Sequence, residues 1–124
     1  MFSDDVEVWS VDTLREVDRD IAQLTQWYGE NGDGKKSELK FADSVARALR
    51  SLTTFPRNHR MWEDEDTIRR FDLPSHNVAI IYFIDDDYLE VIAVQAFHTL
   101  ADPERYNRLI TERVKIAKAR HPKG

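Results

Sequence analysis

The sequence predicts a single α+β domain, residues 1–124, in which an antiparallel sheet of about four strands is covered by helices. Two observations support this prediction. Residues 78–98 contain two apolar runs separated by three aspartates, and segments before and after them carry apolar residues at helical spacing. The expected order of elements is strand, two helices, three strands and a final helix.

The N-terminal part predicts a short strand followed by a helical hairpin. Residues 6–11 alternate well enough for a strand, and Asp12 can then cap a helix by accepting a free N–H of its first turn. The Gly-rich segment 29–34 ends that helix, and a second helix is expected from Ser37 to about Thr54, because the next residue precedes Pro56. Each helix has an apolar stripe, formed by Leu14, Val17, Ile21, Leu24 and Tyr28 in the first and by Phe41, Val45, Ala48, Leu49 and Leu52 in the second.

The central part predicts a loop and then three strands. Residues 56–66 are expected to form the loop, Thr67–Leu73 a weakly alternating strand, and Pro74–Asn77 a turn. Residues 78–98 then form a β-hairpin, since both runs are rich in β-branched and aromatic side chains. Its three-aspartate corner lacks Gly and Asn, which favours a longer loop over a two-residue turn.

The C-terminal part predicts a basic helix over about residues 103–120. Asp102, Pro103 and Glu104 are typical of a helix start, and the buried side is formed by Tyr106, Leu109, Ile110, Val114 and Ala117. Residues 104–124 carry a net charge of +5, whereas residues 1–103 carry −10. This asymmetry indicates contact with a polyanion or an acidic partner, for which the candidate residues are Arg105, Arg108 and Arg113. Alternatively, the basic residues only complement the helix dipole and solubilise its outer face.

Composition sets the expected location and excludes some chemistry. The sequence has no cysteine, and its Gly-rich loop has Gly29 and Lys40 where a calcium loop needs its first and last carboxylates. We therefore expect neither a metal nor another cofactor. The sequence has no run of eighteen apolar residues, and its start is acidic where a signal peptide would be basic, so a cytoplasmic protein without membrane contact is expected.

With this order of elements, the sequence resembles the RelE/ParE superfamily of toxins from bacterial type II toxin–antitoxin pairs. The matching features are the two amphipathic helices, the connection "Leu52…Phe55-Pro56-Arg57", and the strands "Ile80-Ile81-Tyr82-Phe83-Ile84-Asp85" and "Val91-Ile92-Ala93-Val94-Gln95-Ala96-Phe97-His98". The resemblance covers about residues 6–103. It implies a growth inhibitor that is neutralised by a cognate antitoxin protein.

Three branches of this superfamily remain open. RelE- and YoeB-like members cut messenger RNA on the ribosome and often end the last strand in a pair similar to Phe97-His98. ParE-like members inhibit DNA gyrase by binding, and HigB-like members continue past the last strand into a helix after a proline. The sequence departs from the family where Ala79 replaces a common strand arginine. This departure and the acidic body weaken the case for ribonuclease activity, so a non-toxic member that acts as an interaction module is a further alternative.

For RNA cleavage without a metal, the resemblance and the residue types together predict one site. His98 is the candidate acid or base, and Arg70 and Arg60 complete the predicted catalytic set as phosphate clamps. Further RNA or phosphate contacts are assigned to Arg57, His59, Arg69 and Tyr82. Structural roles are the alternative for each: a corner histidine, a core tyrosine, and arginines paired with the acidic residues 63–66.

Overall fold

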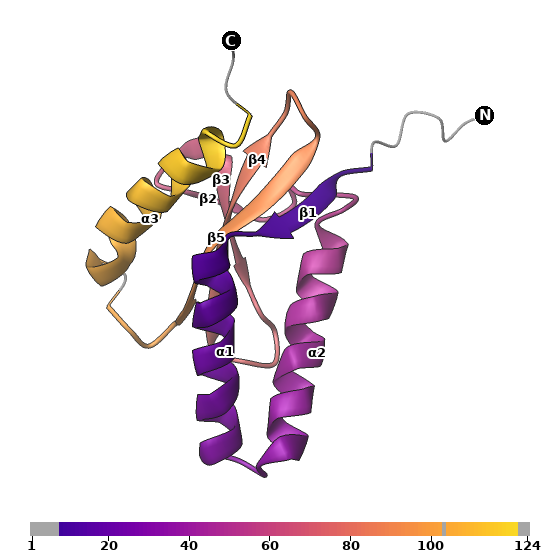
Figure 1. Ribbon diagram of the computed structural model, residues 1–124, viewed down its shortest axis with the longest axis vertical. Coiled ribbons are helices and arrows are strands. Elements are labelled where there is room, and N and C mark those ends of the chain that lie inside the picture. The colour runs from indigo at the N-terminus through magenta and orange to yellow at the C-terminus, as the bar shows by residue number, and fades with distance from the viewer. Residues whose placement is uncertain (1–7, 103, 122–124) are drawn as a thin grey trace, which may run out of the picture.

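The computed structural model describes residues 8–102 and 104–121. Five strands form one sheet and three helices lie against it (Figure 1). In chain order the elements are β1 (Ser10–Thr13), α1 (Arg15–Glu30), α2 (Lys35–Ser51), β2 (Arg60–Trp62), β3 (Glu65–Asp72), β4 (Val78–Asp85), β5 (Glu90–His98) and α3 (Glu104–Lys118).

The sheet has the strand order β1-β5-β4-β3-β2, with β1 parallel to β5 and every other pair antiparallel. The α+β class is thus confirmed, but the sheet is mixed and has five strands. The additional strand, β2, lies in the segment predicted to be a loop. The first strand begins later than predicted, at Ser10, and residues 6 and 7 of the predicted strand lie outside the described part of the chain.

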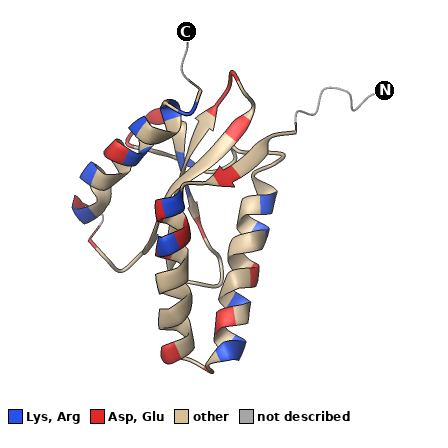
Figure 2. Ribbon diagram, viewed as in Figure 1, with Lys and Arg blue, Asp and Glu red and all other residues tan. Residues whose placement is uncertain are grey.

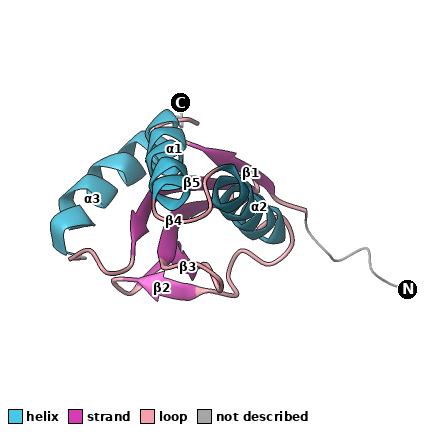
Figure 3. Cartoon of the chain, turned by 90° about the horizontal axis from the view of Figure 1, so that it is seen from below, coloured by secondary structure: helices cyan, strands magenta, loops and turns pink. Residues whose placement is uncertain are grey.

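Helices cover both faces of the sheet (Figure 3). Phe97 on β5 stacks on Tyr106 of α3, and Lys118 lies 5.7 Å from the ring of Phe83 on β4, so α3 covers one face. The α1–α2 hairpin covers the other face. Because β4 is sandwiched between the two layers, residues 78–84 are all buried, which explains their uninterrupted apolar sequence.

The helical hairpin confirms the predicted stripes but not the predicted cap. The stripe residues of α1 and α2 pack in the core or against it. Asp12 does not cap α1; it lies in β1 and accepts a hydrogen bond from Arg120 at 2.6 Å. The reason is that β1 continues its pairing with β5 to Thr13, and the N–H of Leu14 still donates to the Ala93 carbonyl, so the helix starts later.

Helix α3 begins as predicted and buries most of the predicted side. The side chain of Asp102 accepts a hydrogen bond from the N–H of Glu104 at 3.0 Å, while Pro103 lies outside the described residues. Ile110, Val114 and Ala117 are buried, as is Arg113, which the apolar stripe did not predict. Among the described residues, no helix is long and apolar enough to cross a membrane.

Candidate functional site

The sheet register separates the predicted catalytic residues. His98 pairs with Val78, and Arg70 pairs with Ile81 on the other side of β4. Paired residues project to the same side of a sheet, and residues an odd number apart along one strand project to opposite sides. His98 therefore lies on the face of the helical hairpin and Arg70 on the face of α3, so the two do not form one site.

On the α3 face, Arg60 and Arg70 share one carboxylate. They are a cross-strand pair of β2 and β3, and each donates to Asp72 at 3.0 Å. The Arg70 guanidinium also lies 5.6 Å from the ring of Phe97. A phosphate bound here would have to compete with Asp72 for both guanidinium groups.

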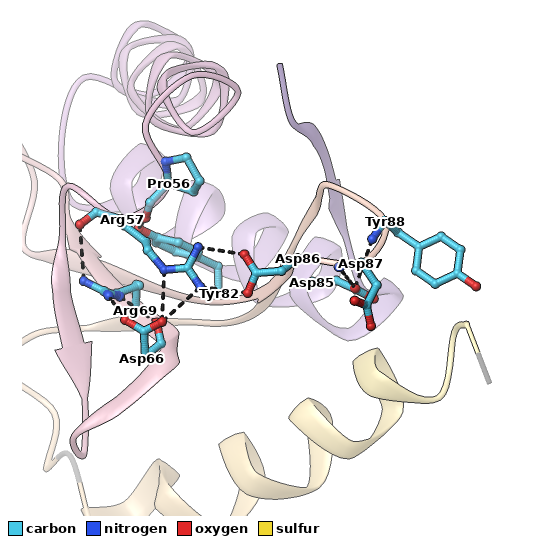
Figure 4. A network of polar contacts seen from close by, with 9 residues as sticks. All are labelled: Pro56, Arg57, Asp66, Arg69, Tyr82, Asp85, Asp86, Asp87 and Tyr88. Carbon is cyan, nitrogen blue, oxygen red and sulfur yellow. Dashed lines mark hydrogen bonds and ion pairs between the residues drawn. The ribbon is translucent and has the colours of Figure 1, made fainter. Parts of the chain in front are cut away.

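At the other end of the sheet, Arg57 and Arg69 belong to a network with two aspartates (Figure 4). Arg57 places its two Nη atoms 2.8 Å from the two oxygens of Asp86 and also contacts Asp66 at 3.0 Å. Arg69 contacts Asp66 at 2.6 Å and donates to the carbonyls of Arg57 and His59. The aspartates, Asp86 first, raise the pKa of Arg57, and the pKa of Asp66 is lowered, chiefly by Arg57. This network links the β4–β5 loop to the start of β3.

Tyr82 is buried and His59 half-buried beside this network. The Tyr82 side chain is fully buried and its hydroxyl donates to the Pro56 carbonyl, and burial raises its pKa. The His59 ring lies 4.0 Å from the ring of Phe71, and burial lowers its pKa. The buried ring of Tyr82 offers no face on which an RNA base could stack.

His98 lies at the end of β5 and has a defined hydrogen bond. The N–H of Leu100 donates to its Nδ1 at 3.3 Å, so the neutral imidazole carries its proton on Nε2. The ring of Trp27, on α1, lies 5.4 Å away in an edge arrangement. The Nε2–H group is therefore the donor of this ring, and His98 lines the cleft between α1 and α3.

This cleft is a groove of about 670 Å³ in which His98 is joined by residues of both helices. One wall is formed by Asp20, Gln23 and Trp27 of α1, and the facing wall by Arg105 of α3 with its neighbours Tyr106 and Leu109. We call it the α1–α3 groove. Its size falls in the range of about 300–1,000 Å³ that is usual for small-ligand sites.

The floor of the groove is the edge of strand β5, where side chains form hydrogen bonds with the backbone. Strand β1 pairs with β5 only as far as Ala93, and no other strand in the described part of the chain neighbours residues 94–98 on that side. Arg113 donates to the Val94 carbonyl at 3.2 Å and to Gln95 Oε1 at 2.6 Å. The Asp20 carboxylate accepts a hydrogen bond from Arg113 at 2.7 Å and another from the Ala96 N–H at 3.4 Å. Burial raises the pKa of the Asp20 carboxyl, because desolvation outweighs the opposing ion pair with Arg113.

The three arginines assigned to a partner therefore have different surroundings. Arg108 is 93% exposed, with Glu112 at 3.6 Å, and Arg105 lines the α1–α3 groove. Arg113 is buried against Asp20, so it stabilises the fold and is not available to a partner. Figure 2 shows basic residues along α3 and acidic residues at the β4–β5 loop. Within residues 8–102 and 104–121, no cluster of three His, Asp or Glu side chains could hold a metal ion.

A mixed sheet with an N-terminal helical hairpin and a C-terminal helix is the fold of the RelE toxins. The structure is similar to a chain of the toxin–antitoxin complex RelBE2 from Mycobacterium tuberculosis, with a TM-score of 0.52 and 17% identity over 77% of this chain and 97% of that one. It is also similar to a double mutant of the E. coli toxin RelE in the free state, with a TM-score of 0.54 and 14% identity over 88% of this chain and 97% of that one. No family model and no curated protein matches the sequence.

Proposed function

We propose that this protein is the toxin of a toxin–antitoxin pair, inhibits bacterial growth and is neutralised by a cognate antitoxin. The observation that carries this proposal is the RelE fold, which extends over nearly the whole length of the similar chains. The charge asymmetry supports an acidic partner segment, and Arg108, a predicted partner residue whose side chain is 93% exposed, would contact it.

We propose further that the toxin acts by cutting messenger RNA in the α1–α3 groove. In such a cleavage the 2′-hydroxyl gives up its proton to water as its oxygen attacks the adjacent phosphorus, and the bond to the 5′-oxygen breaks. As an imidazolium, with Nδ1 protonated and its hydrogen bond from the Leu100 N–H released, His98 would protonate the departing 5′-oxygen from Nε2. Arg105 is the cation that shares the groove with His98 and would stabilise the negative charge on the phosphorane. Arg105 thus takes the clamping role that the sequence had assigned to Arg70 and Arg60.

The second candidate is growth inhibition by binding alone, with DNA gyrase as the target. Two observations favour it. The predicted clamps Arg57, Arg60 and Arg70 are all engaged by carboxylates. Ala79 stands where the family commonly has a strand arginine, and this position is fully buried on the face of α3. A member without toxicity would share both features.

Induced expression in a bacterial host separates these candidates. RNA cleavage predicts growth arrest with new mRNA 5′ ends inside translated messages, which disappear in His98→Ala and decrease in Arg105→Ala. The matched control is Arg108→Ala, since this residue lies on the same helix as Arg105 but outside the groove and should leave cleavage unchanged. Intact messages with relaxed or cleaved plasmid DNA would refute the nuclease and support gyrase inhibition. Normal growth would refute the toxin proposal.

A further inference from the structure

We infer that the α1–α3 groove is a guanine-binding site, formed by an aromatic ring, a carboxylate and a guanidinium. The inference deepens the proposed function, because it names the base recognised beside His98 and rests on RNA being the substrate. The groove itself can be tested for binding without any assumption about toxicity.

The aromatic component is Trp27. Its side chain is 45% exposed although it is among the largest apolar groups of the chain, and it lines the groove. The centroid of its ring lies 5.0 Å from that of Tyr28 and 5.4 Å from that of His98, and both contacts are edge arrangements. Within the described part of the chain, no other ring stacks face to face on this indole. It is therefore able to stack on a planar base.

The acceptor component is Asp20. All the hydrogen bonds that its side chain makes within the described residues go to one oxygen, Oδ2, from Arg113, Gln95 and the Ala96 N–H. The other oxygen, Oδ1, has no such partner in the described part of the chain, and the residue lines the groove. A carboxylate oxygen in this position accepts N–H donors from a bound ligand.

The donor component is Arg105, on the facing wall. Its guanidinium lies 5.9 Å from the ring of its neighbour Tyr106, so it sits over an aromatic surface. Among the bases, guanine presents the O6 and N7 acceptor pair that suits arginine, and it also carries the N2 amino donor. Adenine replaces O6 with an amino donor, and cytosine and uracil lack N7. Guanine therefore matches an arginine on one wall and a carboxylate on the other.

The test is a titration of the purified full chain with guanosine, inosine, adenosine, cytidine and uridine monophosphates, followed by tryptophan fluorescence. Guanosine monophosphate should quench the emission saturably and bind at least about tenfold more tightly than adenosine monophosphate. Inosine monophosphate, which lacks the 2-amino group, should bind more weakly than guanosine monophosphate. This series uses the unmodified chain, so it does not depend on any variant folding.

Variants then locate the site. Trp27→Leu should weaken binding of guanosine monophosphate at least about fivefold by calorimetry. Arg105→Ala should remove the preference for guanosine monophosphate over adenosine monophosphate. Arg47→Ala is the control and should change neither affinity nor preference, because its side chain on α2 is 75% exposed and does not line the groove. The other two tryptophans, Trp9 and Trp62, do not line the groove, and binding of unchanged affinity in Trp27→Leu would place the ligand elsewhere.

Three results would overturn the inference. Equal affinity for all five nucleotides would show that the base is not read, and no binding at millimolar concentration would show that the groove is not a nucleotide site. If a co-expressed partner protein shifts the Trp27 emission while no nucleotide does, the groove is a protein-docking surface. Failure of the proposed function is distinguishable, because it appears as normal growth or intact messages whatever the nucleotide titration gives.

Discussion

Replacing Arg113 with alanine should destabilise the fold through the carboxylate that it leaves behind. Arg113 of α3 reaches across the edge of β5 to Asp20 of α1, so one side chain ties together three elements. The variant loses its bonds to Asp20, Gln95 and the Val94 carbonyl and leaves the Asp20 charge without its cation.

The magnitude follows from burial. The side chains of Arg113 and Asp20 are 10% and 18% exposed, so water screens their interaction only weakly. Removing one partner of a buried pair costs about 3–5 kcal/mol. We expect about 3 kcal/mol, at the low end of that range, because Asp20 keeps its bonds to Gln95 and the Ala96 N–H. Replacing both partners, as Asp20→Leu with Arg113→Met, should recover most of the loss, since no unpaired charge then remains.

The loss of stability in Arg113→Ala should also depend on pH. Burial raises the pKa of the Asp20 carboxyl above its unfolded value, so the stability that this group contributes is present at low pH and is lost as the pH rises through its folded pKa. Arg113 lowers that pKa, and without it the ionised carboxylate becomes more unfavourable. The destabilisation by Arg113→Ala should therefore be larger at pH 7 than at pH 4.

Urea denaturation followed by circular dichroism measures this effect, as a lower midpoint with an unchanged slope. Arg108→Ala, on the exposed side of the same helix, is the control and should change the free energy of unfolding by less than about 0.5 kcal/mol. A loss below about 1 kcal/mol for Arg113→Ala, or a loss independent of pH, would refute the argument, because either result means that water screens the pair.

Three further substitutions test other parts of the fold by the same denaturation measurement. Tyr82→Phe should cost about 1–2 kcal/mol, because it leaves the Pro56 carbonyl without its donor in the core; no loss would mean that water replaces the phenol. Ala79→Arg should prevent folding or cost at least about 3 kcal/mol, because the position is fully buried under α3; a stable variant would show that α3 moves aside. Asp102→Ala should cost about 1 kcal/mol by removing the bond to the Glu104 N–H, and an unchanged midpoint would refute its role as a cap.

The strongly patterned elements were predictable from sequence because each signal is local. Both apolar runs of residues 78–98 form strands, and the stripes of α1 and α2 and most of the stripe of α3 face the core. Strand β2 was missed because three residues cannot show alternation. It exists through its pairing with β3, and its register shifts at Trp62, just before Glu63 and Asp64 adopt positive φ angles.

The candidate site was less predictable than the fold. His98 was selected from sequence because a histidine at a strand end is visible there, and its role stays a prediction; its separation from Arg70 depends on how both strands pair with β4. Asp20 and Trp27 were not selected as site residues, since they lie on a helix far from His98 in sequence. A charged residue on a helix is usually exposed, so the sequence offered no signal for the burial of Arg113.

By itself, the sequence determined the class of fold, the helical hairpin, the central β-hairpin and the start of the last helix, because spacing, capping and turn chemistry act over a few residues. Tertiary structure decided the fifth strand, the parallel pairing of β1, the faces on which His98 and Arg70 lie, and the pairing of Asp20 with Arg113. These features join residues up to 93 positions apart. They are set by strand register and by the packing of helices on both faces of the sheet, which no local pattern records.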